Sequence, residues 1–337
     1  MEVTRVRWVG AAMIAVAVAG RPCPADEAAG RAAEVLREAN VRAGLCALVG
    51  GGPPSAALAV ELARAAPGLI VHVLDADAGA VAAVRGAAVK AGLAGRVTAE
   101  HWTLDRLPYP DNFANLLAVS SDACRVPREE LLRALAPGGA VLLPAGAGGA
   151  RQKLTKPRPP GMDEWTHHRH GPDCNPVSRD SIDMTTVPDR LRWAGDELRC
   201  WSHAIRTAGG RVFVFIRNTI SARDAYNGVS LWKRSYEHVY TGSAPSAAYN
   251  RPVAVGDRVY AHGSGGGVAI IDAASGEVLR TIDRPERLIE LICAESPSGP
   301  ALLLRDANAV SCYDGRTGEQ RWHFAAPANP KVVAPLG

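Results

Sequence analysis

A run of imidazole and carboxylate side chains lies near the middle of this 337-residue sequence. The stretch "DEWTHHRH" supplies Asp163, Glu164, His167, His168 and His170. Side chains of these types are ligands for transition metals. His167 and His170 would share a face only in a helix, and the nearby glycine and prolines oppose a long helix. We therefore expect no metal centre and favour local hydrogen bonds, with His167, His170 and Asp163 kept as the candidate ligands.

A second group of residues could bind a nucleotide-like ligand. Gly50, Gly51 and Gly52 follow the apolar run "GLCALV", and Asp75 ends the next apolar run, "LIVHVLDAD". Consecutive glycines let a ligand approach the backbone closely at the carboxyl edge of a parallel sheet. A carboxylate at the tip of the neighbouring strand can accept hydrogen bonds from two ribose hydroxyls. These residues predict a cofactor edge, provided that the surrounding chain forms such a sheet.

The surrounding chain has the alternation of strands and helices that such a sheet requires. We expect strands at 44–52, 69–77, 96–102, 115–121 and at the end of 128–144, and helices at 28–40, 54–68, 78–95 and the start of 128–144. Strands that alternate with helices imply a parallel sheet covered on both faces. The prediction is an α/β Rossmann-like domain over residues 28–148.

This region resembles a class I S-adenosylmethionine-dependent methyltransferase over roughly residues 30–145. The resemblance rests on the glycine turn, on Asp75, on "LPYPDN" before the fourth strand and on "LLRALAPGGAVLL" at the fifth. It implies a methyltransferase-like fold. It also implies S-adenosylmethionine as the cofactor, held by Gly50, Gly51, Gly52 and Asp75.

Several positions depart from that family. Ala47 and Leu48 stand where the family has an acid before the glycines, and Pro53 and Pro54 follow the turn directly. Prolines remove backbone N–H donors that would serve a ligand. An acid is also missing near Trp102, where it would meet the adenine. We favour a retained fold with a degenerate pocket, and the alternative is an active methyltransferase.

The second half of the sequence repeats one phrase three times. Each copy reads D-x-x-[NST]-G followed by a strand-like stretch, and the starts are 48 and 42 residues apart. The copies contain Asp224, Gly228 and Trp232; Asp272 and Gly276; and Asp314, Gly318 and Trp322. Several short strands in each unit of 40–50 residues are typical of a β-propeller. The prediction is an all-β partial propeller of about three blades.

The residue types of the repeat have structural reasons. A glycine can adopt positive φ in a tight hairpin, and an aspartate can accept hydrogen bonds from the backbone of its own turn. Trp232 and Trp322 stand on the following strand, where a flat ring can pack between blades. Arg280 or Leu279 takes that place in the middle copy. We expect these repeats to act as a structural scaffold.

The repeats resemble those of quinoprotein, or pyrroloquinoline-quinone-type, propellers. The junction "KPRPPGMDEWTH" with "AGDELRCWSH" also resembles large secreted planctomycete-type proteins, in which a methyltransferase-like domain precedes such a propeller. A quinone enzyme needs a calcium site of Glu, Asn and Asp and an aspartate base, and none is identified in the sequence. Bound quinone is therefore not expected, and a quinone-dependent oxidoreductase is the second alternative.

The N-terminus has the pattern of a secretory signal. Arg5 and Arg7 precede an apolar stretch from Trp8 to Gly20, and small residues and prolines follow it. This pattern predicts a signal peptide at 1–25 and an exported, periplasmic or cell-envelope protein with no membrane span after processing. A net charge of +4 without basic blocks argues against nucleic acid as a partner.

The expected organisation is therefore a signal peptide (1–25), an α/β domain (28–148), a linker or crossing segment (151–205) and propeller repeats (206–337). Propellers close with four to eight blades, so three blades leave apolar faces and strand edges uncovered. We expect a protein partner, or the remaining blades, to cover them. Among the seven cysteines, Cys46 and Cys124 are expected to be buried thiols, and Cys174 and Cys200 are disulfide candidates. The favoured function is binding or assembly at the cell envelope.

Overall fold

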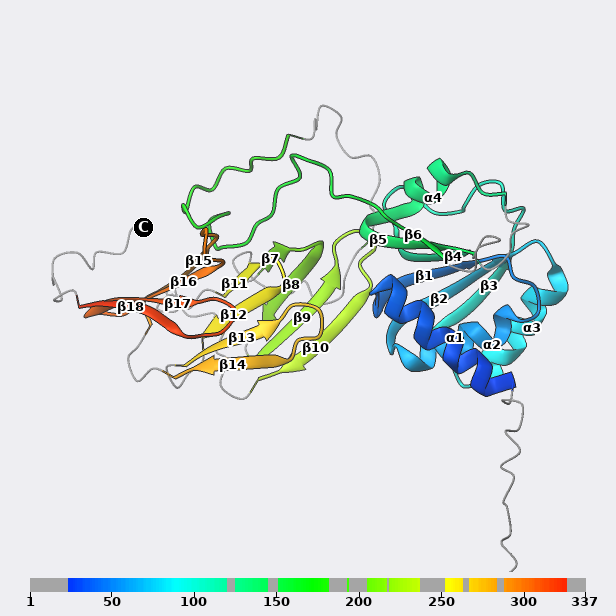
Figure 1. Ribbon diagram of the computed structural model, residues 1–337, viewed down its shortest axis with the longest axis horizontal. Coiled ribbons are helices and arrows are strands. Elements are labelled where there is room, and N and C mark those ends of the chain that lie inside the picture. Colours follow the sequence, from blue (N-terminus) through cyan, green and yellow to red (C-terminus); the bar gives the residue numbers. More distant parts are fainter. Residues whose placement is uncertain are drawn as a thin grey trace, which may run out of the picture.

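The structure is a computed structural model, and an α/β domain and a unit of three antiparallel sheets lie side by side in it (Figure 1). It describes residues 24–119, 125–144, 151–181, 193, 205–216, 218–236, 252–262, 267–283 and 288–325. Residues 1–23, which make up most of the expected signal peptide, lie outside the described residues. The first helix begins at Pro24. No helix in the described part of the chain is long and apolar enough to cross a membrane.

Six strands form the sheet of the α/β domain. They are β1 (Ala43–Val49), β2 (Gly68–Asp75), β3 (Val97–His101), β4 (Ala114–Val119), β5 (Leu135–Leu143) and β6 (Gln152–Thr155). Their spatial order is β3-β2-β1-β4-β5-β6, in which β1 to β5 are parallel and β6 is antiparallel at the edge. The chain order reverses between β1 and β4, which is where doubly wound sheets bind ligands. The expected Rossmann-like methyltransferase fold is confirmed.

Helices cover both faces of this sheet, because alternate residues of each strand point to opposite faces. Helices α1 (Pro24–Ala39), α2 (Ser55–Ala65) and α3 (Ala78–Lys90) pack on one face, and α4 (Arg128–Ala134) on the other (Figure 1). Cys46 and Leu48 of β1 belong to the core under α1, α2 and α3, and Ala47 and Val49 belong to the opposite core. Cys46 is a buried free thiol, as expected.

Two features differ from the sequence prediction. The Pro137-Gly138-Gly139 stretch has the composition of a turn, but it lies inside β5, where the register with β4 shifts. Residues 152–155 were assigned to the linker, and they form β6, which pairs with β5. A bulge accommodates the glycines, and the edge strand has little apolar pattern because only Leu154 is buried.

The repeat unit, defined here as residues 205–325, consists of three four-stranded antiparallel sheets. The first sheet contains β7 (Ile205–Ala208), β8 (Arg211–Ile216), β9 (Thr219–Asp224) and β10 (Ser230–Ser235). The second contains β11 (Val253–Val255), β12 (Arg258–His262), β13 (Val268–Asp272) and β14 (Val278–Ile282). The third contains β15 (Glu290–Ala294), β16 (Ala301–Arg305), β17 (Ala309–Asp314) and β18 (Gln320–Ala325).

The three sheets stack like propeller blades. Strand β11 contacts both β7 and β15, so the first strands of the three sheets lie next to one another. Alternate residues of the second sheet pack against the first sheet and against the third sheet. Val259 and Ile271 join the core that contains Phe213 of the first sheet, and Tyr260 joins the core that contains Leu302 of the third. This packing of each sheet against the next confirms the expected partial propeller.

Candidate functional site

The glycine turn and Asp75 meet at the carboxyl edge of the parallel sheet. Gly50, Gly51 and Gly52 have φ values of 70°, 111° and 61°. One carboxylate oxygen of Asp75 accepts the Gly52 N–H (2.9 Å), and the other accepts the Asp77 N–H (2.9 Å). The Asp75 residue is only 5% exposed. The sequence-predicted cofactor residues are thus brought together, but Asp75 binds the glycine turn itself and is covered from solvent.

The loop after β3 also folds on itself. The Trp102 indole donates to the Arg106 carbonyl, and the Thr103 hydroxyl donates to the Asp105 carboxylate. Leu104 between them has a positive φ of 60°. The part of the chain that would meet an adenine ring therefore carries internal hydrogen bonds, and its one acid, Asp105, is bound to Thr103.

A buried polar pair near this edge was not recognised in the sequence. Tyr109, in the "LPYPDN" stretch, hydrogen-bonds through its hydroxyl to Nδ1 of His72 on β2 (2.8 Å). Burial lowers the pKa of His72, although the charge of Glu100 opposes the shift. A neutral imidazole accepts a hydrogen bond from the Tyr109 hydroxyl at Nδ1 and keeps its own proton on Nε2, which lies 3.7 Å from a Glu100 carboxylate oxygen. The pair ties the loop before β4 to β2.

The segment 163–170, named here the central segment, crosses the first strands of the repeat unit. Trp165 exchanges two hydrogen bonds with Thr207 of β7: its N–H donates to the threonine hydroxyl (2.7 Å), and its carbonyl accepts the threonine N–H (2.9 Å). The carbonyl of Thr166 accepts the N–H of Ala254, which is in β11 (3.0 Å). The main chain therefore anchors the segment. The Trp165 ring itself is 37% exposed.

His167 connects the central segment to the third sheet. Its Nε2 accepts the N–H of Cys293 in β15 (3.1 Å), so the ring proton is on Nδ1, which is 2.7 Å from the Thr166 hydroxyl. Burial, with the nearby positive charge of Arg206, lowers the pKa of His167 to about 4. The histidine is a neutral structural acceptor at neutral pH, and both of its ring nitrogens are used.

His170 binds a different partner. The two histidines do not lie on a helix; they form an antiparallel bridge, in which the His167 N–H donates to the His170 carbonyl (3.0 Å). The His170 ring lies 2.6 Å from a carboxylate oxygen of Asp163 through Nε2. Burial opposes ionisation of Asp163, but the N–H groups of Arg179 and Glu164 and the His170 ring outweigh it and lower its pKa to about 2.

His170 and Asp163, but not His167, line a cavity of about 450 Å³ at the start of the central segment. Its polar side chains form pairs with one another, namely Arg158 with Glu164 (2.6 Å), His170 with Asp163 (2.6 Å), and Arg179 with Asp173. Within the described ranges, no three His, Cys, Asp or Glu side chains are arranged to hold a metal ion. Cys174 nearby is an exposed free thiol, and its candidate disulfide partner, Cys200, lies outside the described residues.

The neutral state of His167 predicts a pH dependence of stability. The unfolded histidine takes up a proton near pH 6.5 and the folded one near pH 4, so the free energy of unfolding falls as the pH falls between these values. Between pH 7 and pH 4.5, we expect protonation of His167 to lower the free energy of unfolding by about 2–3 kcal/mol. Urea unfolding at pH 7 and pH 4.5 should show a smaller loss in His167→Gln than in the wild type. The exposed control His101→Gln should behave as the wild type, and equal losses in all three would contradict the assignment.

The three D-x-x-[NST]-G turns, named here the first (224–228), second (272–276) and third (314–318) corners, share one geometry. In each corner one aspartate oxygen accepts the N–H groups two and three residues later, at 2.8–3.0 Å. The N–H of each glycine donates to the aspartate carbonyl, and Gly228, Gly276 and Gly318 have φ values of 74°, 72° and 71°. The aspartate therefore fixes the turn that only glycine can close without strain.

Each corner lies under a side chain from a preceding segment. A Cβ on Gly228 would lie 2.6 Å from Trp193, one on Gly276 would lie 2.6 Å from Trp232, and one on Gly318 would lie 3.0 Å from Arg280. Arg280 rather than Leu279 therefore takes the place of the tryptophan in the middle repeat. Trp193 was not singled out in the sequence, although its "RLRWAG" context resembles the strand that carries Trp232.

The carbonyl that follows each corner aspartate is also bound from the preceding segment. The Trp193 indole donates to the Ala225 carbonyl (3.1 Å), and the Trp232 indole to the Ala273 carbonyl (3.0 Å). Arg280 has no indole, and the Tyr260 hydroxyl donates to the equivalent Gly315 carbonyl instead (3.0 Å). Each interface therefore combines a close contact over the glycine with a hydrogen bond to the carbonyl after the aspartate.

The first corner has a second partner in the α/β domain. The Asn227 side-chain N–H₂ donates to the carbonyl of Phe113 (2.8 Å) and to Oδ1 of Asn115 (2.8 Å). The Asn115 N–H₂ donates in turn to Asp224 (2.6 Å), and its Oδ1 accepts the Leu45 N–H (2.8 Å). Burial raises the pKa of Asp224, although these hydrogen bonds oppose the shift. We name this set the domain contact.

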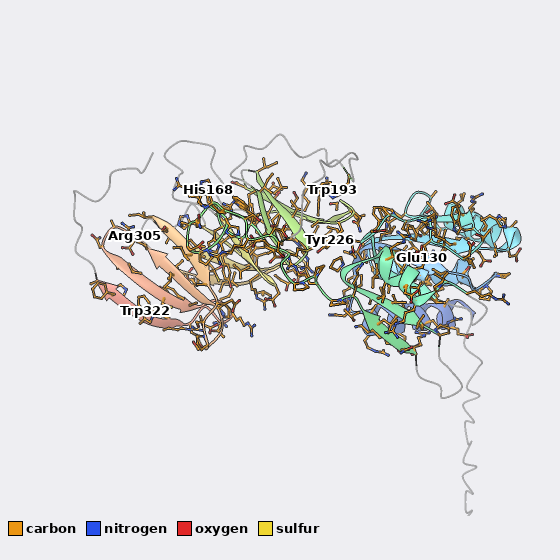
Figure 2. The ribbon with its side chains drawn as sticks, turned by 90° about the horizontal axis from the view of Figure 1, so that it is seen from above. Glu130, His168, Trp193, Tyr226, Arg305 and Trp322 are labelled. Carbon is orange, nitrogen blue, oxygen red and sulfur yellow. The ribbon has the colours of Figure 1, made fainter. Side chains whose placement is uncertain are left out.

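The domain contact lies at the amino-terminal edge of the parallel sheet. Leu45 and Asn115 are near the starts of β1 and β4, whereas the glycine turn follows the end of β1. Strand β10 contacts β1 and β2. Figure 2 shows Tyr226 of the first corner on the side of the repeat unit that faces the α/β domain. The repeat unit therefore docks at the edge opposite the glycine turn and Asp75.

Comparison with known families identifies the type of the repeats. Residues 182–291 match the family model described as outer membrane protein assembly factor BamB. No curated protein matches the chain. The matched range contains the whole of the first and second sheets, so these belong to a BamB-like repeat domain.

Solved structures of both kinds are similar to the chain. They include a putative S-adenosyl-L-methionine-dependent methyltransferase from Methanococcus maripaludis, with 22% identity, a TM-score of 0.33, and 37% of this chain and 57% of that one covered. Geranyl diphosphate C-methyltransferase from Streptomyces coelicolor has 14% identity and a TM-score of 0.30, with 34% and 42% covered. BamB from Moraxella catarrhalis has 17% identity and a TM-score of 0.28, with 36% and 40% covered. The chain thus covers 40–57% of the length of these three proteins.

Proposed function

We propose that the chain is an exported protein of the cell envelope that acts in binding or assembly, and that its methyltransferase-like domain has lost its cofactor. One observation carries the proposal: the Asp75 carboxylate is buried and accepts the N–H groups of Gly52 and Asp77. The BamB family description supports the envelope role, and so does the N-terminal pattern of a secretory signal.

The residues at the glycine turn do not fit S-adenosylmethionine in this arrangement. A ribose needs an Asp75 oxygen that it can reach, and the carboxyl group of the cofactor needs free backbone N–H donors. Here the Gly52 donor and the Asp75 acceptor bind each other, and Pro53 and Pro54 have no N–H to offer. The Gly52 N–H would have to leave Asp75 before it could bind a ligand. The Asp75 oxygens keep further lone pairs, but the residue is only 5% exposed, so a cofactor would have to open the edge to reach them.

An active S-adenosylmethionine-dependent methyltransferase is the second candidate. The strand order and the place of Asp75 at the tip of β2 favour it, because a doubly wound sheet binds ligands at this edge. Under this candidate, Asp75 would turn away from Gly52 when the cofactor enters. The two proposals therefore differ in one measurable quantity, the affinity for the cofactor.

Isothermal titration calorimetry with S-adenosylmethionine separates the two. We expect no binding heat from the full chain at cofactor concentrations up to about 1 mM. An active site with a dissociation constant of about 1 μM would instead bind with a free energy of about −8 kcal/mol. The variant Asp75→Ala serves as the control. Micromolar binding by the wild type that disappears in Asp75→Ala would contradict the loss of the cofactor and favour the methyltransferase.

A further inference from the structure

Trp322 stands at the repeat position that elsewhere covers a neighbouring corner. Trp232, Arg280 and Trp322 each follow the corner glycine by four residues. Trp232 is buried over Gly276, with 9% of the residue exposed, and Arg280 lies over Gly318. Trp322 is 47% exposed and the nearby Phe324 is 64% exposed. In the described part of the chain, no group accepts a hydrogen bond from the Trp322 indole.

The strand that carries Trp322 is held firmly in place. Strand β18 pairs with β17 along its length, including Cys312 with Trp322. Arg321 donates to Asp314 (2.7 Å) and to the Ser298 carbonyl (3.0 Å), which ties the strand to its own corner. Figure 2 shows Trp322 on the third sheet, at the end of the repeat unit far from the α/β domain. The exposed ring is therefore presented by an ordered strand.

The sequence itself narrows what can cover this ring. The 337 residues contain three D-x-x-[NST]-G corners, and each already lies under a side chain of a preceding segment, namely Trp193, Trp232 or Arg280. Their following carbonyls are also bound. A second copy of this chain would bring the same three corners, all of them covered. The interface between the first and second sheets, however, shows in atomic detail what a tryptophan at this position binds.

We propose that Trp322 and Phe324 form a docking surface for a further four-stranded sheet of the same repeat type, carried on polypeptide outside these 337 residues. The ring of Trp322 covers the glycine of that sheet's free corner, and its indole N–H donates to the carbonyl after the corner aspartate. Phe324 stands where the first sheet has Arg234, which pairs with Glu277 (3.5 Å). The partner therefore needs no acid after its corner glycine. This inference names the partner of the binding role proposed above and rests on that role.

The test places an additional sheet with a free corner after Trp322, at the same spacing that separates Trp232 from the second sheet. Trp232 and Trp322 are equivalent, so Ser235 is equivalent to Ala325. A second copy of residues 236–282 is therefore inserted directly after Ala325 in the full chain. The protein is labelled with 5-fluorotryptophan, and Trp322→Phe assigns the Trp322 signal in the ¹⁹F NMR spectrum. We expect this signal to lose its solvent isotope shift in the chain with the insert, and to keep it in the chain without one.

A matched control changes only the contact. Gly276→Val in the inserted copy places a side chain where the Trp322 ring must lie, since a Cβ at the native position would be 2.6 Å from Trp232. The Trp322 signal should then remain exposed. A Trp322 signal that stays exposed beside an intact inserted corner overturns the proposal.

The unextended chain supplies a second test that does not depend on the insert. Trp322→Ser should leave its thermal midpoint unchanged, and sedimentation should show a monomer. A midpoint lowered as far as by the matched Trp232→Ser would show that the ring already packs inside the chain. A dimer that Trp322→Ser abolishes would make a second copy the occupant. Either result overturns the proposal, whereas binding of S-adenosylmethionine would overturn only the loss of the cofactor.

Discussion

Asn227→Ala is expected to lower the free energy of unfolding by about 3 kcal/mol, because it leaves several buried polar groups without partners. Asn227 is 8% exposed. Its side chain donates to Phe113 and Asn115, and its oxygen accepts the Val229 N–H (3.0 Å). The substitution removes all three hydrogen bonds and loosens the domain contact. Urea unfolding at pH 7 measures the loss.

The third corner provides the matched control for this prediction. Thr317 occupies the same corner position, is exposed, and makes no contact with the α/β domain. Thr317→Ala should cost less than about 1 kcal/mol. Amide exchange adds a local readout, because the Leu45 N–H donates to Asn115 and should exchange faster only in Asn227→Ala. Equal losses in the two variants would show that the domain contact adds nothing to the corner itself.

Trp232→Ala is expected to have the largest effect of any single change in the repeat unit, a loss of about 3–5 kcal/mol. The ring is buried against Gly276, shares a core with Phe213 and Val259, and donates to the Ala273 carbonyl (3.0 Å). Truncation leaves a cavity between the first and second sheets and an unpaired carbonyl. The loss is measured by urea unfolding monitored by far-UV circular dichroism.

Trp322→Ala is the control for Trp232→Ala, since the two residues occupy the same repeat position. Because Trp322 is 47% exposed, its truncation should change the free energy of unfolding by less than about 1 kcal/mol. Similar losses of unfolding free energy in the two variants would contradict the contrast between Trp232, which packs over a corner glycine, and Trp322, which packs over none in the described residues.

Much of the fold could be predicted from sequence because its signals are local. The alternation of apolar runs with helical patterns specified the parallel sheet, and the strands β1 to β4 lie within a few residues of their expected ranges. The D-x-x-[NST]-G turns needed only glycine and aspartate at fixed spacing. The exceptions follow the same logic: β6 has a single buried side chain, and Pro137 to Gly139 have the composition of a turn but form a bulge within β5, between Leu135 and Ala140, which both pair with β4.

The candidate site could be located but not understood from sequence. The sequence predicted Gly52 and Asp75 as ligand-binding residues. In the folded chain they bind each other, a contact that no local pattern indicates. The domain contact joins Asn115 to Asn227 across 112 residues, and an asparagine at the start of an apolar strand gives no local sign of such a partner. The central segment was expected to make local hydrogen bonds. Its hydrogen bonds to β7, β11 and β15 could not be predicted, because they depend on tertiary packing.

The central claim is that the cofactor edge of the α/β domain is closed by its own backbone, and amide exchange at Gly52 tests it most directly. The Gly52 N–H donates to the buried Asp75 carboxylate, so it should be protected in the free protein. We predict the same protection when S-adenosylmethionine is added at about 1 mM. A changed exchange rate at Gly52 and Asp77 on addition of the cofactor would show that the edge opens to receive it, and would contradict the account.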